Sequence, residues 1–178
     1  PMLLAAGRLT EQKGYFDLLN AIVLLRQSFP YVQLFIAGGG HLYSDLVQET
    51  ERLGLSENIS FLGIRDDVLK LMTASDIFVN SSHWEGMPVS ILEAMAAGKA
   101  IVATQVGDVP RIGKDKETML LVEPKHPEKI AAAIKLLLTN QMLKESIGPR
   151  AKQEVEKNFS AKSWAEKLFN IYLEVSGK

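Results

Sequence analysis

Residues 81–95 read Ser-Ser-His-Trp-Glu-Gly-Met-Pro-Val-Ser-Ile-Leu-Glu-Ala-Met, and the rest of the chain is organised around them. The apolar run Ile77–Val79 leads into this stretch and predicts a strand. Gly86 and Pro88 then indicate a loop, and Pro88 suits the first position of a helix because its missing N–H has no helical partner there. From Val89 to Ala97 the pattern is almost wholly apolar. The stretch therefore predicts a strand, a loop and an apolar helix.

Glu93 is the only charged residue in that helix, and it lies on the same face as Val89, four residues earlier. A carboxylate alone among apolar side chains is costly unless it has a partner. Two interpretations stay open at this point. Glu93 is either a structural acid satisfied by a backbone donor or a nearby lysine, or a functional group held at a site.

Strands and helices alternate along the remainder of the chain. Leucine and isoleucine recur at helical spacing in the segments between the strands, which predicts helices there. Three more helices are predicted after the last strand, and Ser160 could cap the final one. Apolar strands without strict alternation are typical of an α/β fold whose parallel sheet is covered on both faces. The expected strands are Met2–Ala6, Val32–Ala37, Ile59–Leu62, Ile77–Val79, Ala100–Thr104 and Met119–Val122.

The topology predicts where a ligand would bind. In a doubly wound sheet, ligands bind beyond the carboxyl ends of the strands, at the point where the strand order reverses. That point lies between the first and fourth strands, so the loops Gly7–Gly14 and Ser81–Pro88 should meet there. Free N–H groups of Val89 and Ser90 at the helix start could hold an anion, and Gly86 would let a ligand approach the backbone.

Charged side chains near these loops suit a nucleoside diphosphate. Arg8 and Lys13 would bring two positive charges to the phosphates, and we expect both to be exposed. Glu93 would point back toward the start of its helix, where its carboxylate could accept two hydroxyl protons of a ribose. Glu85 could meet a second hydroxyl-rich group. The alternative for Arg8 and Lys13 is ordinary surface charge.

Other classes of function fit the composition poorly. With 20 basic and 21 acidic residues, the net charge is −1, and no basic block marks a nucleic-acid-binding surface. The three histidines lack ligand spacing and Asp66-Asp67 is interpreted as a helix cap, so we expect no metal. Gly38–Gly40 is interpreted as a tight turn, because it lacks the third glycine of a dinucleotide fingerprint. The chain has no Cys, which fits a reducing compartment. It opens directly on a strand, and we expect a piece of a longer protein.

Two motifs carry a family resemblance. Residues 7–14 read Gly-Arg-Leu-Thr-Glu-Gln-Lys-Gly, and residues 85–98 contain two glutamates, Glu85 and Glu93, separated by seven residues. In this order, and across nearly the whole chain, they resemble the glycosyl transferases group 1 family, retaining enzymes that use nucleotide sugars. The resemblance implies the C-terminal, donor-binding domain of a GT-B architecture, with a Rossmann-like doubly wound parallel sheet of about six strands.

The resemblance also implies roles for the matching side chains. Arg8 and Lys13 would bind the donor diphosphate and stabilise it as the leaving group, replacing a metal ion, and Glu85 would contact the donor sugar near the reacting centre. These three are the implied catalytic residues. Backbone of residues 86–89 would wrap the phosphates. The backbone near Ile64 and Arg65 would meet the base, and Glu93 would hold the ribose. The implied donor-binding residues are Gly7, Arg8, Lys13, Gly14, Ile64, Arg65, Glu85, Gly86, Met87, Pro88, Val89 and Glu93.

Two segments depart from the family pattern. Where the family has Gly-Gly-x-Pro-Glu, this chain has Asp108 in place of the second glycine and Arg111 in place of the glutamate. A later motif loses both of its glycines, at Lys116 and Met119. We expect the fold and the donor site to survive, whereas the loop after the fifth strand is put in doubt.

Three functions are weighed. The first is the donor domain of a hexosyltransferase-like enzyme that moves a sugar from a nucleotide-diphosphate sugar, with UDP or GDP, to a polysaccharide, lipid or other glycan precursor. The others are a nucleotide-sugar-binding module without transfer and a GT-B sugar-nucleotide epimerase; the intact motifs favour the first. Residues 1–178 would then need no cofactor and be inactive alone, with an N-terminal acceptor domain of the same chain as partner. We expect a cytoplasmic protein, and a peripheral place at the inner face of a membrane is left open for the full-length enzyme.

Overall fold

A computed structural model describes residues 1–177 and, of Lys167, only the backbone. Six strands form one sheet in the order β3-β2-β1-β4-β5-β6, and every neighbouring pair is parallel. This confirms the predicted Rossmann-like α/β fold. The strands are β1 (Met2–Ala6), β2 (Gln33–Ala37), β3 (Ile59–Gly63), β4 (Ile77–Asn80), β5 (Ala100–Thr104) and β6 (Leu120–Val122).

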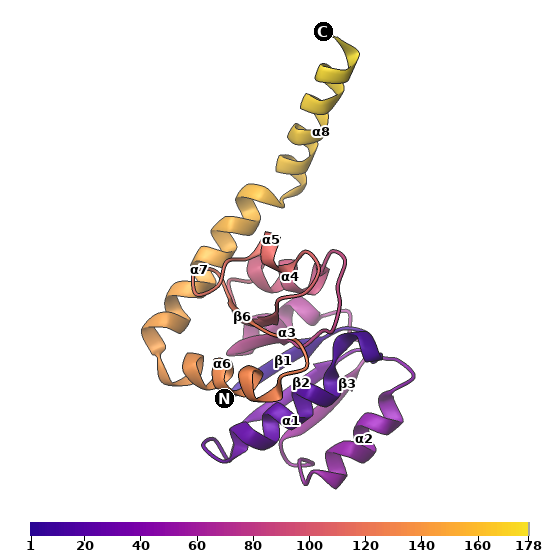
Figure 1. Cartoon of the computed structure of the whole chain (residues 1–178), viewed down its shortest axis with the longest axis vertical. Helices are drawn as coiled ribbons and strands as arrows, with labels where there is room; N and C mark the ends of the chain where they lie inside the picture. Colours follow the sequence, from indigo (N-terminus) through magenta and orange to yellow (C-terminus); the bar gives the residue numbers. More distant parts are fainter. Residues whose placement is uncertain (178) are drawn as a thin grey trace.

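Helices follow the strands in the alternation that the sequence predicts (Figure 1). The short helix over Val68–Ala74 has the predicted bounds, and the other main helices agree within a few residues at each end. The helices are η1 (Glu11–Lys13), α1 (Tyr15–Arg26), α2 (Tyr43–Arg52), α3 (Val68–Ala74), α4 (Val89–Ala96), α5 (Val109–Ile112), α6 (Pro127–Thr139), α7 (Gln141–Asn158) and α8 (Ala161–Ser176).

The sheet separates two apolar cores. One core joins the sheet to α1, α2 and α6, the other joins it to α3, α4 and α5, and α7 contributes side chains to both. Neighbouring residues of one strand serve different cores, as with Leu3 in the first and Leu4 in the second, because side chains alternate across a strand. Burial on both faces explains why the central strands are continuous apolar runs in the sequence.

The strand order reverses at β1. This strand pairs with β2 on one side and with β4 on the other, with Leu3 opposite Leu34 and Ile77 respectively. Since both pairings are parallel, the loops that follow Ala6 and Asn80 leave the sheet at the same edge. The predicted meeting of the first and fourth strands is therefore confirmed.

Two local predictions need correction. Pro88 does not occupy the first helical position of α4; it is the residue before it, with φ −81° and ψ 83°, and its carbonyl accepts the Ile91 N–H at 3.0 Å. Asp67 does precede α3, but its carboxylate accepts two hydrogen bonds from Arg65, at 2.7 and 2.8 Å, instead of capping the helix. In both cases the sequence pattern located the start of the helix to within one residue, but it did not predict the hydrogen bonds made there.

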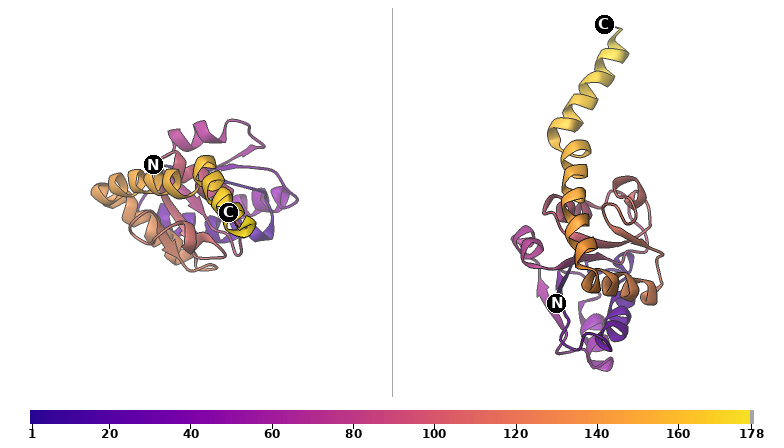
Figure 2. Two further views of the ribbon diagram at one scale, coloured as in Figure 1. Left: turned by 90° about the horizontal axis from the view of Figure 1, so that it is seen from above. Right: turned by 90° about the vertical axis from the view of Figure 1, so that its left-hand side faces the viewer.

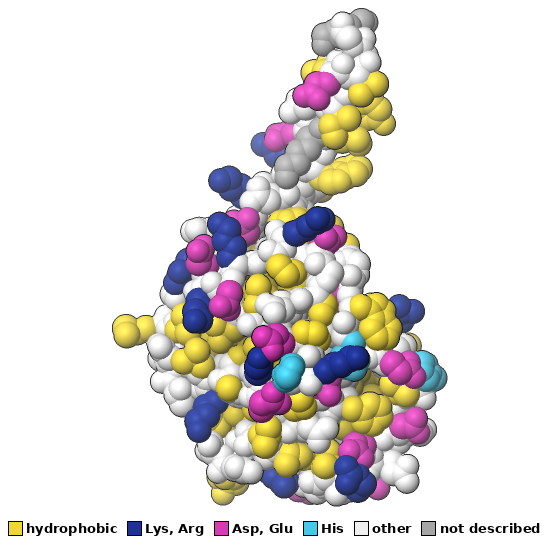
Figure 3. Space-filling model, viewed as in Figure 1, with side chains coloured by type: hydrophobic (Ala, Val, Ile, Leu, Met, Phe, Trp, Pro, Cys, Tyr) yellow, Lys and Arg dark blue, Asp and Glu magenta, His cyan; other side chains and the backbone are white. Residues whose placement is uncertain are grey.

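α8 extends away from the sheet (Figures 1 and 2). Its first turn is capped as predicted, by the Ser160 hydroxyl, which accepts the Ser163 N–H at 3.1 Å. Apolar side chains lie along one side of α8 (Figure 3), and Trp164, Ile171 and Val175 are 64, 55 and 82% exposed. Within residues 1–177, no helix combines the length and the apolar character that crossing a membrane requires.

Candidate functional site

The loop after β1 and the loop after β4 are tied together by hydrogen bonds. The His83 N–H donates to the Gln12 carbonyl at 2.7 Å, and the Gln12 side chain donates to the Trp84 carbonyl at 3.1 Å. The Ser81 hydroxyl donates to the Lys13 carbonyl at 2.8 Å. The two loops that the sequence predicts to meet thus form one connected wall.

Gly14 allows this close contact. It adopts the left-handed conformation, with φ 60° and ψ 32°, between η1 and α1. A Cβ atom at this position would lie 2.1 Å from the Ser81 carbonyl oxygen, so no other residue fits without a shift of the loops. A second link lies beside it, where His83 Nε2 is 2.7 Å from Asp17 Oδ2.

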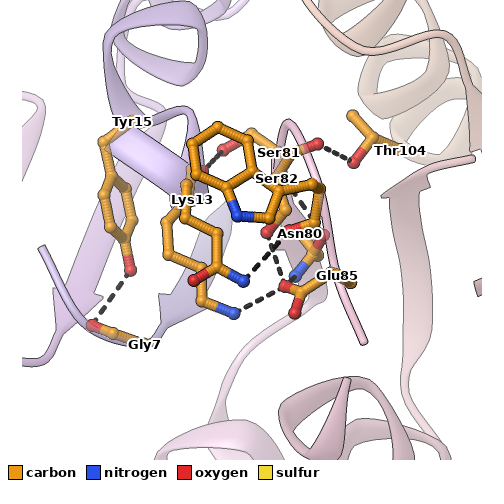
Figure 4. Close-up of polar contacts among 10 residues, drawn as sticks. Gly7, Lys13, Tyr15, Asn80, Ser81, Ser82, Glu85 and Thr104 are labelled. Atoms are coloured by element: carbon orange, nitrogen blue, oxygen red, sulfur yellow. Dashed lines mark hydrogen bonds and ion pairs between the residues drawn. The ribbon is translucent and has the colours of Figure 1, made fainter. Parts of the chain in front are cut away.

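Glu85 lies where the two loops meet, and its side chain is only 5% exposed. Its Oε1 accepts hydrogen bonds from Lys13 Nζ at 2.5 Å, Ser82 Oγ at 2.7 Å and Asn80 Nδ2 at 3.3 Å (Figure 4). Burial would raise the pKa of the Glu85 carboxyl, but the donors from Lys13, Ser82 and Asn80 outweigh burial and hold the pKa below its usual range. Glu85 is therefore an ionised acceptor at neutral pH.

Further hydrogen bonds support the residues around Glu85. The Tyr15 hydroxyl donates to the Gly7 carbonyl at 3.2 Å, and the Thr104 hydroxyl donates to the Ser82 carbonyl at 2.6 Å (Figure 4). Burial, reinforced by the negative charge of Glu85, raises the pKa of Tyr15. Tyr15 therefore stays a neutral donor at physiological pH. The sequence offered no pattern that connects these residues.

A hollow of about 380 Å³ opens beside Glu85, and we call it the Glu85 hollow. It lies between the β1 loop and the segment that enters α4, and it combines two cations with one carboxylate. Its lining residues are Ala6, Gly7, Arg8, Gln12, Lys13, Glu85, Gly86, Met87, Pro88, Val89 and Ser90.

A second hollow, of about 370 Å³, contains Glu93, and we call it the Glu93 hollow. It shares Ala6, Gly7, Arg8 and Ser90 with the Glu85 hollow, so the two are continuous. An elongated ligand could occupy both, with its charged middle at the shared residues. The lining residues are Ala6, Gly7, Arg8, Ala37, Gly38, Gly39, Ile64, Arg65, Val68, Ser90 and Glu93.

The structure brings the predicted donor-binding residues together. All of them except Gly14 line one of the two hollows, and Arg8 lines both. Arg8 is exposed, as expected. The expectation that Lys13 is exposed was wrong, because its side chain is 15% exposed and pairs with Glu85. One charged group of the site therefore already has a protein partner.

The start of α4 offers fewer free donors than the sequence suggested. The Val89 N–H was expected to be free, but it donates to the Met87 carbonyl at 3.0 Å. For the Ser90 N–H, no backbone acceptor is found in the described part of the chain, and Ser90 lines both hollows. Gly86 has open space where a Cβ atom would lie, so a ligand can approach the backbone there.

Glu93 is half-buried, and its carboxylate makes no hydrogen bond or ion pair with any residue that the structure describes. The interpretation of Glu93 as a structural acid satisfied by its neighbours is thus not supported. Its position in the wall of a hollow agrees with the other interpretation, in which the carboxylate faces a ligand.

The interpretation of Gly38–Gly40, after β2, as a tight turn alone was incomplete. Gly38 and Gly39 line the Glu93 hollow, and the Gly39 carbonyl accepts the Leu9 N–H at 2.9 Å. A signal for this was available, since β2 lies next to β1 and the loops after both strands leave the sheet at the same edge. Across residues 1–177, no cluster of three or more His, Cys, Asp or Glu side chains could hold a metal ion.

Both segments that depart from the family pattern lie outside the two hollows. Arg111, within the short helix α5, forms an ion pair at 3.0 Å on the surface with Asp108, the residue before that helix. Gly107, with φ 53°, still packs closely on the Glu85 backbone, where a Cβ atom would lie 1.9 Å from the Glu85 carbonyl oxygen. The substitutions thus leave the contact between this loop and the Glu85 loop in place.

Known proteins share this sequence and fold. Residues 1–154 match the family model described as glycosyl transferases group 1. The chain is 33% identical over 184 residues to an uncharacterised glycosyltransferase of Methanocaldococcus jannaschii, covering 99% of this chain and 46% of that protein. The chain spans about half the length of the curated relatives it matches.

Solved structures agree. The C-terminal domain of LpcC, a glycosyl transferase group 1 family protein of Francisella tularensis, has a TM-score of 0.82 and 27% identity, covering 90% of this chain and 86% of that one. HepE of Anabaena in complex with UDP-glucose has a TM-score of 0.86 and 26% identity, covering 95% of this chain and 48% of that one.

Proposed function

Because the chain belongs to the glycosyl transferases group 1 family, we propose that it is the donor-binding domain of a retaining, hexosyltransferase-like enzyme that uses a UDP- or GDP-sugar. The observation that carries this proposal is the pair of continuous hollows, with Arg8 at their junction and one carboxylate in each, Glu85 and Glu93. A nucleotide sugar has the matching order of groups: hydroxyls of a ribose, a diphosphate, and hydroxyls of the transferred sugar.

The donor would lie along both hollows. In the Glu93 hollow, the Glu93 carboxylate accepts hydrogen bonds from the ribose hydroxyls, and the base lies near Ile64 and Arg65. The diphosphate meets Arg8 and the Ser90 N–H at the junction, and the sugar lies beside Glu85. This order agrees with the roles implied by the sequence motifs.

Transfer would depend on charge stabilisation at the diphosphate. When the bond between the sugar's anomeric carbon and the phosphate oxygen breaks, the leaving diphosphate takes the electron pair and gains negative charge. Arg8 and Lys13 are placed to stabilise that charge, a role that a metal ion fills in other phosphate-transfer sites. The enzyme would then need no divalent cation, and the sugar would pass to a polysaccharide, lipid or other glycan precursor.

The acceptor would bind on an N-terminal domain of the same chain. In support, the chain spans about half of its curated relatives, and the C-terminal domain of LpcC superposes on it as a separate unit. The exposed apolar side of α8, with Trp164, Ile171 and Val175, is suited to packing against that domain. Residues 1–178 alone would bind the donor but transfer no sugar.

Calorimetry of the chain in EDTA tests the proposal. The titrants are UDP, GDP, UDP-glucose and GDP-mannose, with AMP as a control that carries one phosphate only. We expect at least one nucleoside diphosphate and its sugar to bind in EDTA, and more tightly than AMP. Binding that appears only after magnesium or manganese is added would contradict the metal-free site.

A further inference from the structure

All donors that reach the Glu85 carboxylate meet the same oxygen. Lys13, Ser82 and Asn80 each donate to Oε1, whereas no donor in the described part of the chain meets Oε2. A carboxylate oxygen has two lone pairs in the plane of the group, so three donors saturate Oε1. The one-sided arrangement leaves Oε2 as the acceptor that remains for a ligand.

The two neutral donors are held rigidly. Ser82 is fully buried and Asn80 is 5% exposed. Asn80 Oδ1 accepts the Ser82 N–H at 3.3 Å, and the Ser82 carbonyl accepts the Thr104 hydroxyl at 2.6 Å. Their orientation is therefore set by the end of β4 and by β5, independently of any ligand.

The three donors differ in their access to a ligand. Lys13 lines the Glu85 hollow, so a diphosphate bound there competes with Glu85 for its ammonium group. Ser82 and Asn80 do not line that hollow, and a ligand in it cannot displace them. When Lys13 turns toward a phosphate, these two donors still hold Oε1.

We propose that Ser82 and Asn80 are positioning residues for Glu85, holding its Oε1 so that Oε2 is presented to a hydroxyl of the donor's sugar. This inference rests on the proposed function of the site. In this proposal a nucleotide without a sugar does not reach Glu85 Oε2. Loss of the Ser82 hydroxyl should therefore change the affinity for a nucleotide sugar and not the affinity for the nucleotide alone.

The test compares two buried serines. Ser82→Ala removes a donor to Glu85, whereas Ser75→Ala removes a buried hydroxyl that donates to the Met72 carbonyl and lines neither hollow. Calorimetry with UDP-glucose and UDP, or with GDP-mannose and GDP if the chain binds those, gives the affinities. For Ser82→Ala we expect about tenfold weaker binding of the nucleotide sugar, about 1.4 kcal/mol, with nucleotide affinity within about twofold of wild type. Ser75→Ala should change both affinities by less than about twofold.

A pH profile separates positioning from a structural role. Glu85 must be ionised to accept a sugar hydroxyl, and loss of the Ser82 donor raises its pKa, while Lys13 and Tyr15 remain as its other neighbours. The acidic midpoint of nucleotide-sugar binding should thus move to higher pH in Ser82→Ala and stay in place in Ser75→Ala. If Ser82→Ala melts well below wild type, Asn80→Ala supplies the same two readouts with a smaller effect, since its bond is longer.

The outcomes distinguish this inference from the proposed function. If Glu85→Gln loses nucleotide-sugar affinity but Ser82→Ala and Asn80→Ala keep both the affinity and the midpoint of wild type, the positioning role is wrong and the proposed function stands. If wild type binds no nucleotide sugar in the panel, the proposed function fails, and the positioning role fails with it.

Discussion

Lys13 Nζ lies 2.5 Å from Glu85 Oε1, and this ion pair joins the loop after β1 to the loop after β4. Both side chains are largely buried, at 15 and 5% exposure. Removal of one partner from a buried pair leaves the other charge uncompensated, which costs more than the pair contributes. Lys13 and Arg8, which look equivalent in the sequence motif, should therefore respond differently to substitution.

Arg8→Ala should weaken binding of a nucleoside diphosphate by about 1.5–3 kcal/mol, the range for a lost hydrogen bond to a charged group. Stability should not change, because the Arg8 side chain is exposed and pairs with no described residue. Calorimetry and thermal melting measure the two effects. Arg111→Ala is the control, since Arg111 is an exposed arginine that lines neither hollow. Equal affinity in Arg8→Ala and Arg111→Ala would remove Arg8 from the site.

Lys13→Ala should weaken the same binding and also lower the free energy of unfolding at pH 7, by about 1–3 kcal/mol, because Glu85 is left without its cation. The double variant Lys13→Ala with Glu85→Gln should regain part of that stability, as measured by urea unfolding. The pair's contribution depends on pH in a defined direction. The folded pKa of Glu85 is depressed, so the contribution is present above the unfolded pKa of about 4.3 and is lost as pH falls through the folded value. A Lys13→Ala variant as stable as wild type at pH 7 would contradict this role.

Glu93→Gln should weaken binding of UDP or GDP by about 1.5–3 kcal/mol but leave pyrophosphate binding unchanged, because only the ribose hydroxyls need the carboxylate. The melting temperature should stay the same, since the Glu93 carboxylate pairs with no described residue and lines a hollow. Calorimetry with the nucleotide and with pyrophosphate makes the comparison. A lower melting temperature with unchanged nucleotide affinity would assign Glu93 to structure instead.

The fold and the place of the site could be predicted from the sequence because both depend on local patterns. Continuous apolar strands require a sheet buried on both faces, and the order of elements places the loops at residues 7–14 and 81–88 at the same edge. The exposure of Lys13 could not be predicted, because its partner Glu85 is 72 residues away in sequence.

The supporting contacts were missed for a related reason. Ser82, Asn80 and Thr104 are ordinary polar residues, and nothing in their spacing shows that they lie within hydrogen-bond distance of one another or of Glu85. Strand pairing brings them together, through the parallel register of β4 with β5, in which Asn80 lies opposite Ala103. The pattern that would have predicted these contacts is the presence of polar residues at the carboxyl ends of neighbouring strands.

Tyr15→Phe should make the chain less sensitive to alkaline pH. The folded pKa of Tyr15 is raised, first by burial and then by Glu85, so its contribution to stability is present below the unfolded pKa of about 10 and is lost as pH rises above it. Urea unfolding between pH 8 and pH 11, values chosen to bracket about 10, should show a smaller loss of stability in Tyr15→Phe than in wild type. Tyr31→Phe is the matched control, because Tyr31 is 87% exposed. The same loss of stability in both variants would show that Tyr15 does not govern the loss of stability at alkaline pH.

Gly107→Ala should disturb the site from outside the hollows. Gly107 has φ 53°, and a Cβ atom there would lie 1.9 Å from the Glu85 carbonyl oxygen. Gly54→Ala is a matched control, since Gly54 has φ 65° but its nearest contact would be a flexible arginine nitrogen at 3.9 Å. Both variants carry the left-handed strain of about 1–2 kcal/mol.

The two glycine variants therefore separate backbone strain from displacement of Glu85. Both should lower the free energy of unfolding, but only Gly107→Ala forces the Glu85 backbone to move. Nucleotide-sugar affinity, measured by calorimetry at a temperature where both variants are folded, should fall in Gly107→Ala and stay at the wild-type value in Gly54→Ala. If the affinity is the same in both, the position of the Glu85 backbone does not limit donor binding, and the contact between Gly107 and Glu85 serves folding alone.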